Sequence, residues 1–272
     1  MEKRRMCPQC RAFISADDRV CPYCNSEVNP RPVYRRSTAD DLGGLIPHAR
    51  FLTIVLVLIN TGLYIATVLA SMRAGGGAVD VDSQVLVNFG AKYAPEIAQG
   101  QWWRLITAGF LHGGILHILM NMWVLFDLGA QVEDSFGGAR YLLIYLISNI
   151  TGFVTSLFLL PGLSIGASAA IFGLIGAMIA MGVRERGSRG SAIRGFYMRW
   201  AIYGLALSLI PGTDWAAHVG GIAGGFIVGL IVGTPGFSAA IERFWQIAAG
   251  VVVAITGLAF FDMAVNLLQV SK

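Results

Sequence analysis

Four polar side chains interrupt long apolar stretches of this sequence: His117, Asn121, Ser168 and His218. Apolar stretches of about 20 residues cross a bilayer as helices. Polar groups inside such helices are costly and are commonly functional. A hydroxyl beside an imidazole is the smallest nucleophile and base arrangement for acyl transfer. That chemistry requires helices that bring the two groups together.

The surroundings of Ser168 and His218 favour such an approach. Small residues surround the serine from Gly166 to Ala170, and glycines recur at every fourth position from Gly221 to Gly233, just after the histidine. Small residues at this spacing let membrane helices approach closely, although a lone serine in such a helix ordinarily serves packing. Both helices run in the same direction, so we expect their first turns at matched depth. Asp214, one turn before His218, is not assigned as a third member.

His117 and Asn121 are four residues apart and share one helix face. Both side chains donate hydrogen bonds, which suits stabilisation of a negative oxygen. Ordinary interhelical hydrogen bonding and a metal-binding pair remain alternatives. His112 lies closer to the outer boundary, and we interpret it as an interfacial or loop-packing residue.

All four cysteines lie near the N-terminus, as Cys7-Pro-Gln-Cys10 and Cys21-Pro-Tyr-Cys24. Two such pairs at this spacing predict a closed tetrahedral structural zinc site in a zinc-ribbon-like module over residues 1–28. Two disulfides or a redox pair are the alternatives, and a cytoplasmic location argues against stable disulfides. Four cysteine ligands leave no open position for water, so we expect no cofactor in catalysis.

The apolar stretches predict an all-α polytopic membrane protein, because nothing alternates with the period of a transmembrane barrel. Residues 29–50 form the expected linker, and residues 51–268 the membrane domain. The predicted spans are 51–72, about 111–130, 141–160, 165–183, 196–210, 215–233 and 241–268.

Charge predicts the orientation. Only 13% of residues are charged, against roughly 25% in soluble domains. With seven spans, every Lys and Arg except Arg73, Lys92, Arg104 and Lys272 falls on one side. The positive-inside rule then predicts a cytoplasmic N-terminus and an outside C-terminus. A bacterial inner (plasma) membrane is the simplest location. No basic patch is interleaved with exposed aromatics, which argues against nucleic-acid binding. The polar first 50 residues predict no cleavable signal peptide.

The first external loop, from Arg73 to Thr107, contains Trp102-Trp103-Arg104. Tryptophan and arginine at a membrane boundary are typical of an interfacial anchor, so we expect this loop to lie half submerged among the headgroups.

Five motifs in order resemble the rhomboid intramembrane proteases. They cover residues 102–233 and are followed by an extra helix at 241–268. The motifs are Trp103-Arg104, His117-x-x-x-Asn121, Glu133-x-x-x-Gly137, Gly166-x-Ser168 and Ala217-His218-x-x-Gly221.

This resemblance implies a rhomboid-like bundle with Ser168 as nucleophile and His218 as general base. It further implies an oxyanion hole made by His117, Asn121 and the backbone N–H of Ser168, and an aromatic ring, here Phe172, packed on the histidine. Gly166, Gly221, Trp103, Arg104 and Glu133 would be supporting residues. A substrate gate is implied near the fifth span and the first loop.

Two residues depart from the family pattern. Ala169 replaces the usual glycine and adds a methyl group near the expected oxyanion site, and Phe172 stands where a tyrosine is common. Neither change removes a reacting group.

The sequence thus predicts a serine endopeptidase that cleaves transmembrane helices of other proteins near the outer membrane face, where Gly, Pro or small polar residues ease unwinding. A cytoplasmic partner of the zinc module is also possible. The alternatives are an inactive rhomboid-like protein that binds membrane helices, and a transporter or channel. A transporter or channel would favour ionisable groups at the midplane of the membrane and an inverted repeat in the sequence, and neither is evident.

Overall fold

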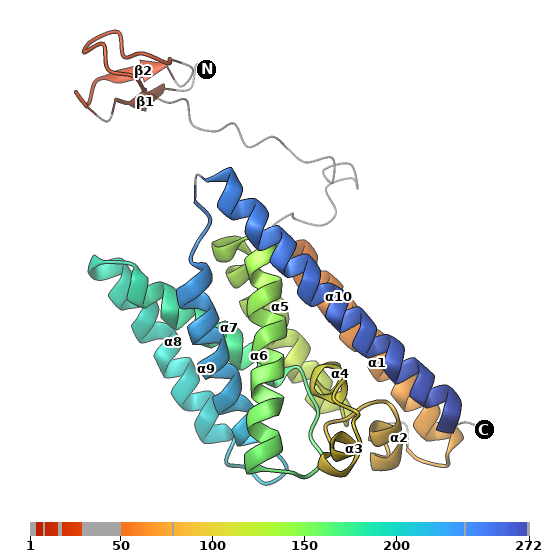
Figure 1. The fold of residues 1–272 in the computed structure, drawn as a ribbon. Helices are drawn as coiled ribbons and strands as arrows, with labels where there is room; N and C mark the ends of the chain where they lie inside the picture. The colour runs from red at the N-terminus through yellow and green to blue at the C-terminus, as the bar shows by residue number, and fades with distance from the viewer. Residues whose placement is uncertain are drawn as a thin grey trace. The chain divides into compact units, whose positions relative to one another are not determined.

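The chain forms two compact units, Met1–His48 and Ala49–Lys272. The computed structural model describes residues 4–7, 9–15, 18–28, 50–77, 79–236 and 238–270. Figure 1 shows the elements of both units. The predicted linker lies outside the described residues except for Arg50.

The N-terminal unit is a short hairpin followed by a second, similar turn. Strand β1 (Arg4–Met6) pairs antiparallel with β2 (Phe13–Ser15). Its small core contains Cys7, Ile14, Cys21 and Val28. So small an apolar core is insufficient for independent stability without a further crosslink such as a metal.

The second unit is all-helical. Its elements are α1 (Phe51–Arg73), α2 (Ser83–Asn88), α3 (Ala94–Ala98), α4 (Arg104–Thr107), the 3₁₀ turn η3 (Ala108–Phe110), α5 (Ile115–Phe136), α6 (Gly138–Leu159), α7 (Ser168–Arg184), α8 (Gly187–Leu207), α9 (Trp215–Val232) and α10 (Ala239–Val270).

Among the described residues, five helices are long and apolar enough to cross a membrane: α1, α5, α6, α9 and α10. Helix α7 is apolar but shorter. The predicted span 196–210 differs most from the structure, because α8 begins at Gly187 and its first half carries Arg189 and Arg194. The count of seven spans stays a prediction.

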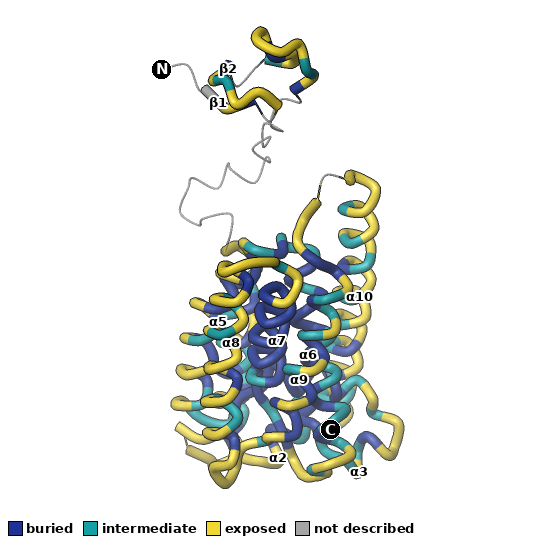
Figure 2. Tube along the Cα trace, turned by 90° about the vertical axis from the view of Figure 1, so that its left-hand side faces the viewer, coloured by how far each residue is buried: buried dark blue, intermediate teal, exposed yellow. Residues whose placement is uncertain are grey.

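Helix α7 occupies the centre of the bundle and is buried over most of its length (Figure 2). It packs against α9, where glycines replace side chains at the contact. A Cβ atom added at Gly221 would lie 2.1 Å from the carbonyl oxygen of Ala169, and one at Gly225 would lie 1.9 Å from that of Gly173. Backbone therefore meets backbone along this interface, as the four-residue glycine repeat predicted.

The adjoining face of α9 packs against α6 in a similar way. An added Cβ at Gly220 or Gly224 would overlap Thr155 or Thr151 of α6. The hydroxyl of Thr151 also donates to the carbonyl oxygen of Gly220 at 3.1 Å. Helix α9 thus packs closely against both α6 and α7. These contacts fix the rotation of α9 about its own axis and therefore the direction in which His218 points.

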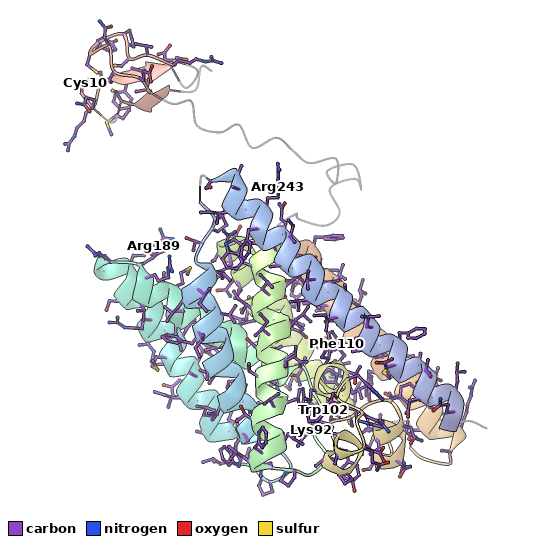
Figure 3. The ribbon with its side chains drawn as sticks, in the orientation of Figure 1. Cys10, Lys92, Trp102, Phe110, Arg189 and Arg243 are labelled. Atoms are coloured by element: carbon purple, nitrogen blue, oxygen red, sulfur yellow. The ribbon has the colours of Figure 1, made fainter. Side chains whose placement is uncertain are left out.

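The segment between α1 and α5 is not an irregular loop, because it contains the short helices α2, α3 and α4. Arg104 is only 2% exposed, so the expectation that it anchors the loop among headgroups was wrong. Its guanidinium donates to the carbonyl oxygens of Val87 and Ala91 and to Gln101. Burial lowers the pKa of Arg104. Trp102, by contrast, stays 61% exposed (Figure 3).

Glu133, near the end of α5, caps the start of α1. Its carboxylate accepts from the backbone N–H of Leu52 at 3.0 Å, and from the N–H and hydroxyl of Thr53 at 2.9 and 2.7 Å. These amides belong to the first turn of α1 and have no intrahelical acceptor. Glu133 is therefore a structural residue that ties α1 to α5.

Residues labelled in Figure 3 mark the two ends of the helical unit. Arg189 and Arg243 lie at one end, where α8 and α10 begin, whereas Lys92 and Trp102 lie at the other (Figure 3). These three basic residues lie at the ends that the predicted division assigns to them, and the orientation in the membrane stays a prediction.

Candidate active site

Ser168 and His218 meet at the ends of α7 and α9. Ser168 is the first residue of α7, and His218 lies in the first turn of α9. The serine Oγ lies 2.8 Å from His218 Nε2, a hydrogen-bond distance. Both side chains reach this position because the glycines of α9 let the two backbones touch. The pair thus has the geometry of a nucleophile beside a general base.

Two further contacts fix the imidazole. The ring of Phe172, one turn after Ser168, stacks on it with centroids 4.2 Å apart and planes at 24°. The hydroxyl of Ser208, just after the last residue of α8, lies 2.5 Å from His218 Nδ1. The ring is therefore held on one face and at both nitrogens.

Asp214 does not contact His218 in this way. Its carboxylate accepts from the backbone N–H of Ala217 at 2.9 Å and caps α9. It also accepts from the hydroxyl of Ser156 in α6. Asp214 thus fixes the start of the helix that carries the histidine.

The segment that leads into Ser168 is held by the first loop. Lys92 and Ser164 exchange backbone hydrogen bonds of 3.0 and 2.9 Å, and the N–H of Gly166 donates to the carbonyl oxygen of Ala108 at 3.0 Å. Lys92 itself is fully buried, donates to the carbonyl oxygen of Leu160, and has a lowered pKa because of desolvation. The segment that precedes Ser168 is therefore held by backbone hydrogen bonds before α7 begins.

Gly166 is required at its position for two reasons. Its φ of +124° lies in a region that L side chains rarely adopt. An added Cβ would also lie 2.7 Å from Nε2 of His117 and 3.6 Å from Oγ of Ser168. This measurement places His117 beside the Gly166–Ser168 turn.

Asn121 lies one turn after His117 in α5. It is 8% exposed, and its Nδ2 donates to the carbonyl oxygen of His117 at 2.8 Å, which leaves its second N–H for another acceptor.

His112 packs edge-to-face on His117 with centroids 5.0 Å apart and is fully buried. His112 therefore packs in the loop before α5, as one of its two predicted roles required.

The methyl group of Ala169 packs inside the bundle. An added Cβ at Gly152 of α6 would lie 2.7 Å from the Ala169 Cβ. A glycine on the facing helix thus accommodates the methyl group that departs from the family pattern.

The four cysteines of the N-terminal unit fit a tetrahedral zinc ion. Their sulfur atoms all lie within 4.8 Å of one another. Cys7 and Cys24 are 3.8 Å apart, and Cys10 and Cys21 are 3.7 Å apart. Zinc–sulfur bonds of about 2.3 Å in a tetrahedron give edges of about 3.8 Å, whereas a disulfide needs about 2.05 Å. The donor set is therefore compatible with a structural metal, and its sulfur separations match the edges of such a tetrahedron better than a disulfide bond.

The backbone around the sulfurs repeats in the two halves of the cluster. The N–H of Arg11 donates to the carbonyl oxygen of Cys7, and that of Asn25 to Cys21. Both donors adopt positive φ, 61° and 51°. The backbone N–H of Cys10 is the main cause that lowers the pKa of Cys7 to about 6. That shift favours the thiolate that zinc binds.

Sequence reasoning missed Ser208. A serine at the end of a membrane helix carries no periodic signal of its own. The short connection through Pro211 and Gly212 to His218 was the available clue, because it brings the end of one helix close to the start of the next.

A family model described as "Rhomboid domain" matches residues 99–235. The chain is 39% identical over 168 residues to "Rhomboid protease GluP" of Bacillus subtilis (strain 168), which covers 60% of this chain and 32% of that protein. It is 34% identical over 168 residues to "RHOMBOID-like protein 4" of Arabidopsis thaliana, covering 55% and 39%. "Rhomboid-like protease 1" of Toxoplasma gondii is 29% identical over 229 residues, covering 79% and 76%. The chain spans about a third of the first of these relatives and two fifths of the second.

Proposed function

Because the chain belongs to the rhomboid family, we propose that it is an intramembrane serine endopeptidase that cleaves the transmembrane helices of other proteins. The observation that carries this proposal is the 2.8 Å contact between Ser168 Oγ and His218 Nε2 at the ends of two apolar helices.

In the proposed reaction, Ser168 attacks the scissile carbonyl carbon while His218 Nε2 takes the hydroxyl proton. The tetrahedral intermediate collapses as the imidazolium gives that proton to the leaving amine. Water then attacks the acyl-enzyme, with His218 again as base, and Ser168 regains its proton when the carboxyl product leaves.

The oxyanion would form at the N-terminus of α7. The backbone N–H of Ser168 belongs to the first turn, which has no intrahelical acceptor, and the helix dipole favours negative charge there. His117, beside Gly166, and the free N–H of Asn121 supply the proposed side-chain donors. One such donor in a low-dielectric site contributes about 3 kcal/mol.

The proposed topology has seven spans with a cytoplasmic N-terminus and an outside C-terminus in the plasma membrane. It is supported by the separation of Arg189 and Arg243 from Lys92 (Figure 3). The dyad then lies near the outer face, where water reaches it. Substrate would enter beside α8, whose surface is largely exposed in the bundle.

We propose that residues 1–28 of the N-terminal unit form a structural zinc module. Cys7, Cys10, Cys21 and Cys24 would hold the ion, which would stabilise the fold and supply no catalytic chemistry. Its surface would then be available to a cytoplasmic partner.

Cleavage of a membrane-embedded substrate tests the proposal. The wild-type protein, Ser168→Ala and the control Ser135→Ala would be reconstituted with a tagged single-span substrate, and the fragments identified by mass. Cleavage by the wild type and the control alone supports the proposal. Cleavage by Ser168→Ala refutes the assignment of the nucleophile, and binding without cleavage by the wild type favours an inactive helix-binding protein.

A further inference from the structure

We propose that Ser208 is a positioning residue that sets the tautomer of His218 and thereby makes its Nε2 the base for Ser168. The inference rests on the proposed function of His218 as base. It adds a third member to the Ser168–His218 pair, a hydroxyl at the C-terminal end of α8.

The assignment follows from counting protons. The Ser208 hydroxyl has one hydrogen. Its Oγ lies 2.7 Å from the carbonyl oxygen of Gly204, which can only accept, so the hydroxyl donates there. Toward His218 Nδ1 the same oxygen must then accept. A neutral imidazole with its proton on Nδ1 has a lone pair on Nε2, and that lone pair faces Ser168 Oγ at 2.8 Å.

Because Ser208 and His218 are both buried, the hydrogen bond between them determines which nitrogen of the imidazole carries the proton. Ser208 is 3% exposed and His218 is 8% exposed, so water does not compete freely for Nδ1. A buried donor left without an acceptor costs free energy, and the ring would respond by moving its proton to Nε2 or by rotating. Either change removes the lone pair that accepts the serine proton.

The position of Ser208 at the end of α8 joins the base to that helix. One turn earlier, Gly204 packs on the edge of the Phe172 ring, where an added Cβ would lie 2.6 Å from Cζ. Phe172 in turn stacks on His218. The end of α8 therefore supports the imidazole twice, through the Phe172 face and through Nδ1. Displacement of this end would release both supports together.

Nitrogen NMR of the histidines provides a test that does not depend on cleavage. The chain has four histidines, and the spectrum of His218→Gln assigns the signal of His218 in protein labelled with ¹⁵N-histidine. We expect a proton on Nδ1 and an unprotonated Nε2 in the neutral wild type. In Ser208→Ala we expect the Nε2-protonated form to gain population. A wild-type His218 with its proton on Nε2 overturns the proposal, whether or not a substrate is cleaved.

Kinetics provide the second readout. Ser208→Ala is expected to lower kcat about tenfold, the effect of one neutral hydrogen bond, with KM unchanged. Ser208→Thr keeps the hydroxyl and is expected to restore most of kcat. Ser135→Ala is the matched control, because Ser135 makes the same bond to the carbonyl four residues earlier, at 2.7 Å, without a histidine.

Two kinetic outcomes would overturn the proposal. One is a kcat of Ser208→Ala within twofold of the wild type. The other is an equal loss in Ser208→Ala and Ser208→Thr accompanied by equally lowered melting temperatures, which would reveal a purely structural residue. A wild type that cleaves no substrate would instead refute the proposed function, and the NMR measurement would still decide the tautomer.

Discussion

Replacing Gly225 with alanine tests whether the close approach of α7 and α9 creates the site. Gly225 lies two turns beyond His218 and has no part in the proposed chemistry. Its added Cβ would lie 1.9 Å from the carbonyl oxygen, 2.5 Å from the carbon and 2.6 Å from the Cα of Gly173. All three atoms are backbone, so no side-chain rotation relieves the overlap.

The expected loss follows from the displacement that the methyl group requires. Ordinary contact begins near 3.4 Å, so the helices must separate by about 1.5 Å at this point. Overpacking of this kind destabilises a protein by about 1–3 kcal/mol. If part of the separation reaches the other end of the helices, the 2.8 Å contact between Ser168 and His218 breaks. A misplacement of about 1 Å in a reacting pair lowers the rate roughly 100-fold.

The assay compares Gly225→Ala with Gly257→Ala. Gly257 lies in α10 with no atom within 4 Å of an added Cβ, so its substitution should leave stability unchanged or raise it by about 0.5–1 kcal/mol. Melting temperature in detergent and initial rates of substrate cleavage would be measured for both. Wild-type stability and rate in Gly225→Ala would refute the reasoning, as would equal impairment of the two variants.

Three further predictions concern separate parts of the chain. Glu133→Ala should destabilise the helical unit by about 1–3 kcal/mol, because the first-turn amide of Thr53 loses its acceptor; an unchanged melting temperature would contradict the capping role. Phe172→Tyr should keep cleavage near the wild-type rate because the ring still stacks on His218, whereas Phe172→Ala should lower kcat by about three- to tenfold; equal rates for all three proteins would show that the stacking is irrelevant. Purified protein should contain one zinc per chain by atomic emission, and Cys10→Ser should lose it; full occupancy in this variant would exclude the four-cysteine site.

The sequence predicted much of the helical layout because helices of this kind are marked by long stretches of apolar residues. Predicted and observed bounds agree closely for α1, α6 and α9, where apolar residues fill the whole span. They disagree for α8, because hydropathy marks where apolar residues begin and not where the helix begins. Its first turns carry arginines that a helix accommodates as well as a loop does.

Contacts between residues far apart in the sequence were harder to predict. The four-residue glycine repeat predicted that α7 and α9 would touch, since the pattern is local to one helix. Nothing local indicates that Glu133 caps a helix that begins 80 residues earlier, or that Arg104 turns inward to bind the carbonyl oxygens of Val87 and Ala91. Ser208 belongs to the same class, because its partner depends on how α8 ends against α9.

Covalent labelling tests the central claim, that His218 activates Ser168 as a nucleophile, most directly. The wild-type protein would be treated with a fluorophosphonate in detergent, and the adduct located by peptide mass spectrometry. The account predicts one adduct on Ser168, absent from Ser168→Ala and formed at least about 100-fold more slowly in His218→Ala. An adduct on another residue, or labelling of His218→Ala at the wild-type rate, would contradict it.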